Sequence, residues 1–245
     1  MTRSYSFDGA EAWLRATAPD ELPALAIARS ATEALALALD GAAVPAAEDP
    51  APPAYYARSA LLLLCTLGLR TARAALVVIA SGYEPEAHGL KRRLSEIHAR
   101  AQAVADDKSG AHARQWLEGV GPSTPRKITA KYGSLDLFDT YSASEHADAR
   151  GMHWWLMVPT EGTQRGVLVQ PHRRPPFGNA ILTEIAMETR DLVALMQVVR
   201  WGGVQGLDQL TDLIDQAIDL FYAPPGGLEL RDGDGEPPRM PDENQ

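Results

Sequence analysis

The side chains best suited to chemistry in this chain gather in two stretches, residues 82–107 and 135–146. They combine guanidinium, carboxylate, hydroxyl and imidazole groups: Arg92, Arg93, Glu96, His98, Tyr141, Ser144 and His146. An imidazole can transfer protons near neutral pH, and a guanidinium can stabilise the negative charge of a phosphate group. The set therefore fits acid–base chemistry on an anionic substrate, provided that the two stretches lie side by side.

Residues 82–107 are predicted to form a helix with one apolar side. Five apolar residues recur in it at helical spacing: Leu90, Leu94, Ile97, Ala101 and Val104. At about 100° per residue, Arg93 and His98 flank this stripe on opposite sides, roughly 140° apart. Arg92 and Glu96 are spaced for an ion pair on the outer face, and Arg93 is spaced to reach Glu96 as well. A solvated charged face beside a core stripe explains the same pattern without any chemistry.

Residues 135–146 are predicted to form a second helix, ending near Glu145. Tyr141 and Ser144 share one face of it, and Phe138 lies one turn before Tyr141, so this face is expected to meet the core. Buried hydroxyl and imidazole groups need hydrogen-bond partners, and the polar side chains of residues 92–96 are the nearest candidates if the helices pack together. The group is either a buried polar network that fixes the register of the helices or a catalytic or ligand-binding constellation.

The chain carries no strong motif for a metal ion, a phosphate loop or an activated serine. The nearest approach to a metal signature is a short acidic and histidine-containing run: Glu145, His146, Asp148 and His153. This run straddles the predicted end of a helix, which separates its side chains. We therefore expect no metal ion and no cofactor.

The composition favours a soluble cytoplasmic protein. The chain has 245 residues, 45% of them hydrophobic, and a formal net charge of −9, which argues against a general nucleic-acid or membrane-surface binder. Cys65 is the only cysteine, so no internal disulfide can form, and we expect it to be a buried small hydrophobe. The most apolar run, residues 60–80, is interrupted by Arg70 and Arg73, which predicts a buried core helix and no membrane span.

The pattern of elements predicts a mostly α-helical bundle with one small β-hairpin at residues 153–170. Helices are expected over residues 21–40, 54–81, 82–107, 111–118, 126–132, 135–145, 181–201 and 207–222. Residues 172–179 are expected to form a loop before the seventh of these helices. The predicted organisation is N-terminal helices with a Pro/Ala-rich linker over residues 1–53, the bundle over residues 54–223 and a disordered acidic tail over residues 224–245.

The Arg93–Glu96 pair, followed by the Tyr141, Ser144 and His146 segment, resembles a widespread group of uncharacterised bacterial helical proteins. That group is similar to the HEPN-type domains, named for higher eukaryotes and prokaryotes nucleotide-binding. Such domains are often dimeric, and many are ribonucleases in defence systems. Their signature is an arginine followed a few residues later by a histidine, which Arg93 and His98 match. The resemblance covers residues 54–146.

Two functions therefore fit the sequence, one enzymatic and one not. The resemblance implies a metal-independent ribonuclease in defence or stress response, with RNA as substrate and a homodimer as its assembly. In that protein Arg93 stabilises phosphate charge and His98 or His146 acts as the general base. The alternative is a non-enzymatic helical module that binds a partner protein and whose polar network is structural. Its partner surface is expected to include Trp154, Trp155 and Trp201.

Overall fold

The computed structural model describes residues 23–40, 42, 52–119, 125–132, 157–159, 165–167, 175–198 and 212. Six helices lie in this part of the chain: α2 (Pro23–Asp40), α3 (Pro53–Ala80), α4 (Glu84–Asp106), α5 (Ala111–Leu117), α6 (Pro125–Tyr132) and α9 (Pro175–Val198). The mostly helical architecture predicted from the sequence is confirmed for these residues. Most helix bounds fall within one or two residues of their predicted positions.

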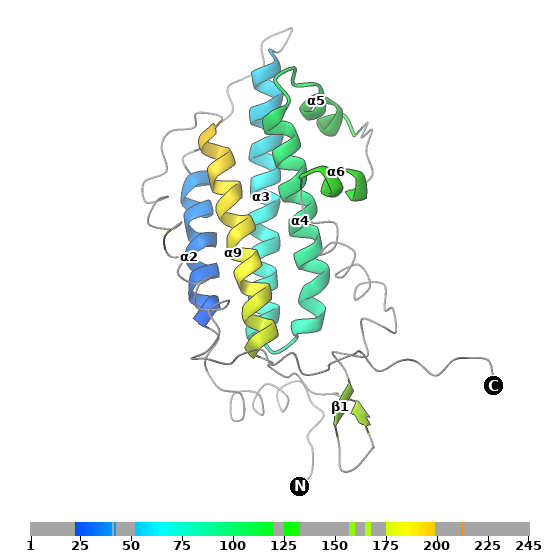
Figure 1. The fold of residues 1–245 in the computed structure, drawn as a ribbon. Helices are drawn as coiled ribbons and strands as arrows, with labels where there is room; N and C mark the ends of the chain where they lie inside the picture. The colour runs from blue at the N-terminus through cyan, green and yellow to red at the C-terminus, as the bar shows by residue number, and fades with distance from the viewer. Residues whose placement is uncertain are drawn as a thin grey trace, which may run out of the picture.

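The four long helices α2, α3, α4 and α9 lie side by side as a bundle (Figure 1). Helix α3, predicted to be the central helix, packs against each of the other three, and so does α9. Helix α3 runs antiparallel to the others, while α2, α4 and α9 run in the same direction (Figure 1). The short helix α6 packs on α4, and α5 packs mainly on α3.

Small residues let the helices approach closely at the centre of the bundle. Cys65 on α3 is buried, as predicted, and its thiol lies 3.8 Å from the carbonyl oxygen of Leu192 on α9. Gly68 lies one turn further along α3, and a methyl group added there would come 2.5 Å from Leu192 Cδ1. The close contact of α3 with α9 therefore depends on a residue without a side chain at this position.

The start of α9 corrects one prediction. Residues 172–179 were expected to form a loop because of their prolines, but the helix already begins at Pro175. Proline is tolerated in the first turn of a helix, where its missing N–H would have no intrahelical partner, so the Pro175–Pro176 pair starts the helix instead of preventing it. Asn179 in this added turn is buried, and its side-chain oxygen accepts a hydrogen bond from the backbone N–H of Ala24 at 3.3 Å. This bond ties the start of α9 to the start of α2.

The predicted break between α4 and α5 is confirmed. Gly110 adopts a left-handed backbone with φ of 68°, and an added Cβ would lie 2.9 Å from the carbonyl oxygen of Pro53. Glycine is therefore required both by the turn and by its contact with the start of α3.

Two short strands, β1 (Met157–Pro159) and β2 (Arg165–Val167), pair antiparallel with Met157 opposite Val167. They fall within the hairpin predicted at residues 153–170. The connecting residues 160–164 and the outer parts of that hairpin lie outside the described residues, so the hairpin as a unit stays a prediction. The same holds for the helices expected over residues 135–145 and 207–222 and for both chain ends.

Helix α3 is long and apolar enough to cross a membrane, with a mean hydropathy of 1.8 over an 18-residue window. Half of that window is buried inside the bundle, where α3 serves as the core helix. Arg70 and Arg73 lie on its exposed side. The predicted cytoplasmic location is compatible with this arrangement and stays a prediction.

Candidate functional site on helix α4

Helix α4 presents three different sides, and the sequence predicted one of them correctly. The stripe that contains Leu94, Ile97 and Val104 is buried against the core, and Leu90 at its edge is partly buried. A second side faces α9 and is polar. The third side is open and carries Arg93 at the edge of a groove.

The side facing α9 holds a fully buried lysine. Lys91 is 1% exposed, and its ammonium group lies 2.9 Å from Ser95 Oγ, 3.0 Å from Glu188 Oε1 and 3.3 Å from Glu184 Oε2. Ser95 in turn donates a hydrogen bond of 2.7 Å to Glu188 Oε1. We call Lys91, Ser95, Glu184 and Glu188 the lysine cluster. It joins α4 to α9 through side chains on both helices.

The lysine cluster offers an acceptor to each N–H donor of the Lys91 ammonium group. An ammonium group has three N–H donors, and the cluster offers Lys91 three acceptors from three different residues. The side chains of Glu184 and Glu188 remain 21% and 17% exposed, but Glu188 Oε2 is buried and has no hydrogen-bond partner among the described residues. A buried lysine is tolerated only with such pairing, because an unpaired buried charge is costly. The cluster therefore fixes how α9 sits along α4.

Two histidines extend this polar side in both directions. His88, one turn before Lys91, is 2% exposed, and burial together with the nearby Lys91 charge lowers its pKa to about 4. His88 is therefore neutral at pH 7. His98, one turn after Ser95, lies with its Nε2 3.7 Å from a carboxylate oxygen of Asp191 on α9. Both imidazoles thus belong to the packed interior side of α4.

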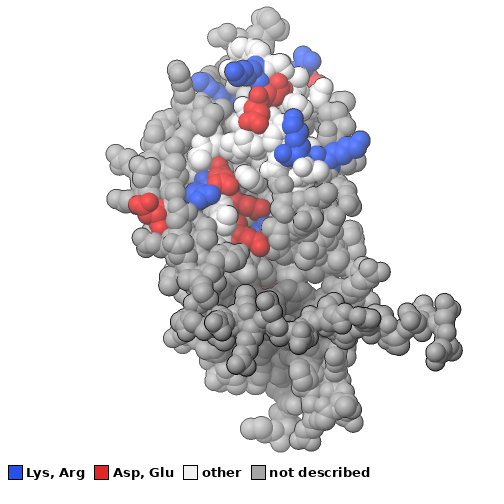
Figure 2. All heavy atoms as spheres, viewed as in Figure 1, with Lys and Arg blue, Asp and Glu red and all other residues white. Residues whose placement is uncertain are grey.

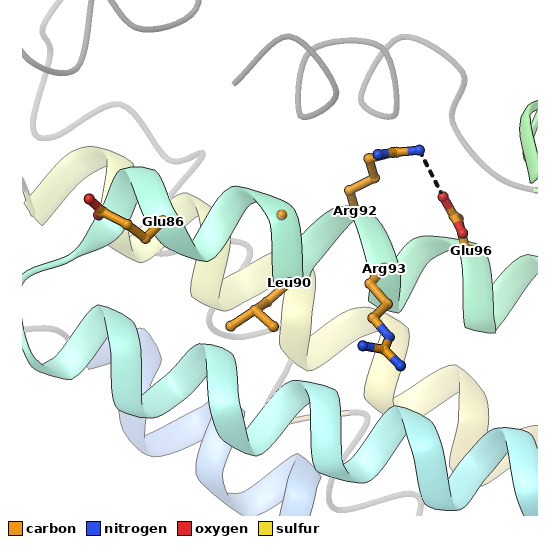
Figure 3. A pocket seen from close by; sticks show the side chains of 6 residues that line it. Glu86, Leu90, Arg92, Arg93 and Glu96 are labelled. Atoms are coloured by element: carbon orange, nitrogen blue, oxygen red, sulfur yellow. Dashed lines mark ion pairs between the residues drawn. The ribbon is translucent and has the colours of Figure 1, made fainter. Parts of the chain in front are cut away.

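The open side of α4 borders a groove of about 530 Å³. Among the residues that the structure describes, its lining consists of Glu86, Gly89, Leu90, Arg92, Arg93 and Glu96. Arg92 and Glu96 form the predicted ion pair at 3.2 Å and point away from α3, whereas Arg93 points toward it (Figure 3). Arg93 is exposed and forms no ion pair or hydrogen bond with any residue that the structure describes.

The structure does not bring Arg93 and His98 together within one chain. Arg93 lines the groove, and His98 lies at the α9 interface beside Asp191. This separation follows from their helical positions, which differ by roughly 140°. The other predicted site residues, Tyr141, Ser144 and His146, lie outside the described residues, so their approach to α4 stays a prediction.

The lysine cluster was missed at the sequence level, although a signal for it exists. Polar residues on α4 recur at alternating spacings of three and four: His88, Lys91, Ser95 and His98. Such a repeat marks one continuous helix face, as an apolar repeat would. Its matching partners, Glu184 and Glu188, are one turn apart on α9. The sequence alone does not distinguish a buried lysine from one in a solvated run of charged residues. The burial of Lys91 was therefore not predicted.

Charges of both signs are interspersed over the described part of the face shown in Figure 2. No extended single-sign patch is visible among the described residues of this face. Within the described residues, no group of three or more His, Cys, Asp or Glu side chains is placed to hold a metal ion.

The chain matches no protein-family model, no curated protein and no solved structure.

Proposed function

We propose that this protein is a non-enzymatic helical interaction module. The observation that carries the proposal is the lysine cluster, in which the buried Lys91 and Ser95 of α4 hold Glu184 and Glu188 of α9. These groups are packed against a neighbouring helix and are bonded to it. They act as structural parts of the bundle, and the module offers its outer helix faces to a partner.

The histidines of α4 support the same conclusion. A general base must reach the proton that it removes, within about 2.6–3.2 Å or through one water. His88 is buried and His98 packs beside Asp191, so neither imidazole is on the side of α4 that borders the groove. The open side of α4 thus offers charges for binding but, among the described residues, no imidazole for proton transfer.

A second function, the metal-independent ribonuclease, is favoured by one separate observation. Arg93 presents a guanidinium with no described partner in an open groove, which is the arrangement that contacts a phosphate group. If RNA binds there, the base must come from elsewhere than His98 of the same chain. His146 is the remaining candidate from the sequence.

One experiment separates the two functions. Purified protein is incubated with RNAs of varied sequence, with and without EDTA, beside the variants Arg93→Ala, His98→Ala and His146→Ala. The interaction module predicts intact RNA in every reaction. The ribonuclease predicts cleavage that survives EDTA, is lost in Arg93→Ala and His146→Ala, and persists in His98→Ala. EDTA-resistant cleavage with this mutational pattern would overturn the interaction proposal.

A further inference from the structure

We propose that the outward side of α3 is a docking surface for an acidic amphipathic helix of a partner protein. The inference rests on the proposed interaction function and names both the surface and the chemistry of its partner. Five residues of α3 share this side and are all exposed: Leu63, Thr66, Arg70, Arg73 and Val77. We call these five residues the α3 seam.

The α3 seam has the spacing of a surface on which another helix packs. Leu63, Arg70 and Val77 recur every seven residues, and Thr66 and Arg73 each follow three residues after a member of that series. This alternation of three and four keeps side chains in one line along a helix, as in the residues that meet a second helix in a coiled coil. The seam is about 21 Å long, which matches a partner helix of about 15 residues.

Both ends of the α3 seam expose large apolar side chains. Leu63 is 52% exposed and Val77 is 66% exposed. The described helices α2, α4, α5 and α9 all pack against α3, and they leave this side of it open. A partner that covers the two ends would remove apolar surface from water, which favours binding.

The centre of the α3 seam is positively charged. Arg70 and Arg73 form no ion pair or hydrogen bond with any residue that the structure describes, and α3 has no acidic residue in its 28 positions. Arg93 on α4 points toward α3 and adds a third guanidinium at this level of the bundle (Figure 3). The level follows from the next residue, since a methyl group added to Gly68 of α3 would lie 3.7 Å from Leu94 Cδ1. The partner should therefore place carboxylates opposite the centre of the seam.

The order of the residues favours a protein helix over an anionic membrane. Arg70 stands midway between Leu63 and Val77 on the same side of α3. A membrane that buried both apolar ends would bury this guanidinium among acyl chains, which is costly. The net charge of −9 also repels an anionic lipid surface. A helix with apolar residues at its ends and carboxylates at its centre complements the whole seam.

A pair of synthetic peptides tests the α3 seam. Each is a helical peptide of about 20 residues with leucine at the contact positions of both ends. One carries glutamate at the central contact positions, and the other carries lysine there. Their affinities for the full chain are measured by fluorescence anisotropy. Wild type should bind the glutamate peptide at least about tenfold more tightly than the lysine peptide, and Arg70→Glu/Arg73→Glu should reverse this preference.

Two exposed positions on α2 provide matched controls. Arg29→Glu reverses an arginine outside the seam, and Leu37→Ser removes a leucine that is 73% exposed. Neither change should alter the affinity for the glutamate peptide. Leu63→Ser should weaken that affinity at least about threefold, because it removes apolar contact area at one end of the seam. Circular dichroism reports whether each variant remains folded.

Three results would each overturn the docking surface: no saturable binding of the glutamate peptide to wild type, equal affinities for the two peptides, or unchanged affinities in Arg70→Glu/Arg73→Glu. Co-sedimentation with vesicles of phosphatidylcholine and phosphatidylserine is measured in parallel. Vesicle binding that is lost in the same double variant, without peptide binding, would overturn the proposal in favour of a membrane surface. None of these results bears on whether the protein cleaves RNA, so the proposed function is tested separately.

Discussion

Lys91 is the residue on which the contact between α4 and α9 depends most directly. Replacing it by methionine keeps much of the side-chain volume but removes the charge that two carboxylates share. Glu184 and Glu188 would then face each other without a cation. Loss of one partner from a buried ion pair costs about 3–5 kcal/mol, and the partial exposure of both carboxylates places this variant near the lower end. Urea denaturation of Lys91→Met should therefore show a loss of about 3 kcal/mol.

The matched control is Arg93→Met, the same kind of change two positions along the helix. Arg93 is exposed and has no described partner, so its free energy of unfolding should change by about 0.5 kcal/mol or less. Equal losses of unfolding free energy in the two variants would show that the ion pairs of the lysine cluster do not stabilise the fold. Adding Glu188→Gln to Lys91→Met should recover part of the loss, because it removes one of the two unpaired carboxylates.

At the scale of the element, the contact of α3 with α9 depends on Gly68. Alanine at this position gains about 1 kcal/mol in helix propensity, but its methyl group would meet Leu192 Cδ1 at 2.5 Å. Overpacking of this kind costs about 1–3 kcal/mol, so Gly68→Ala should be destabilising overall. Thermal and urea denaturation of the single variant give the net effect.

Leu192→Val separates steric crowding from any other cause of that loss. Valine lacks the Cδ atoms that collide, so the double variant should lose less stability than the sum of the two single variants. Strict additivity of the two losses would contradict the close contact of Gly68 with α9.

Helix positions were easier to predict than helix contacts. The apolar repeat of residues 90–104 located α4 and its core side, because periodicity is a local property of the chain. Prolines misled the prediction at the start of α9, since the same residue type ends a helix and also suits its first turn. The pairing of Lys91 with Glu184 and Glu188 joins residues more than ninety positions apart. No local pattern specifies such a pairing.

At the scale of the whole molecule, the bundle class followed from composition and periodicity, but the candidate site did not. The sequence grouped Arg93 and His98 because they are close in the chain. The fold separates them, with Arg93 at the groove and His98 beside Asp191. Two residues that are close in the sequence form one site only if they lie on the same helix face or meet across an interface.

The stability of the whole bundle at acid pH should depend on one buried group, His88. His88 has a pKa lowered to about 4 from its ordinary value of 6.5, mainly because burial disfavours the charged imidazolium. Below pH 6.5 the unfolded chain takes up this proton while the folded chain does not. Stability from a neutral His88 is therefore complete above pH 6.5 and is lost as the pH falls toward 4.

The test is urea denaturation of wild type and His88→Gln at several pH values between 7 and 4. The wild-type unfolding free energy should fall across this window, and the slope should be shallower in His88→Gln because glutamine does not titrate. The Lys91 charge that acts on His88 remains in both proteins, so the difference in slope belongs to His88. Parallel curves for wild type and His88→Gln would show that His88 titrates alike in the folded and unfolded chains, and that the polar side of α4 is open to water.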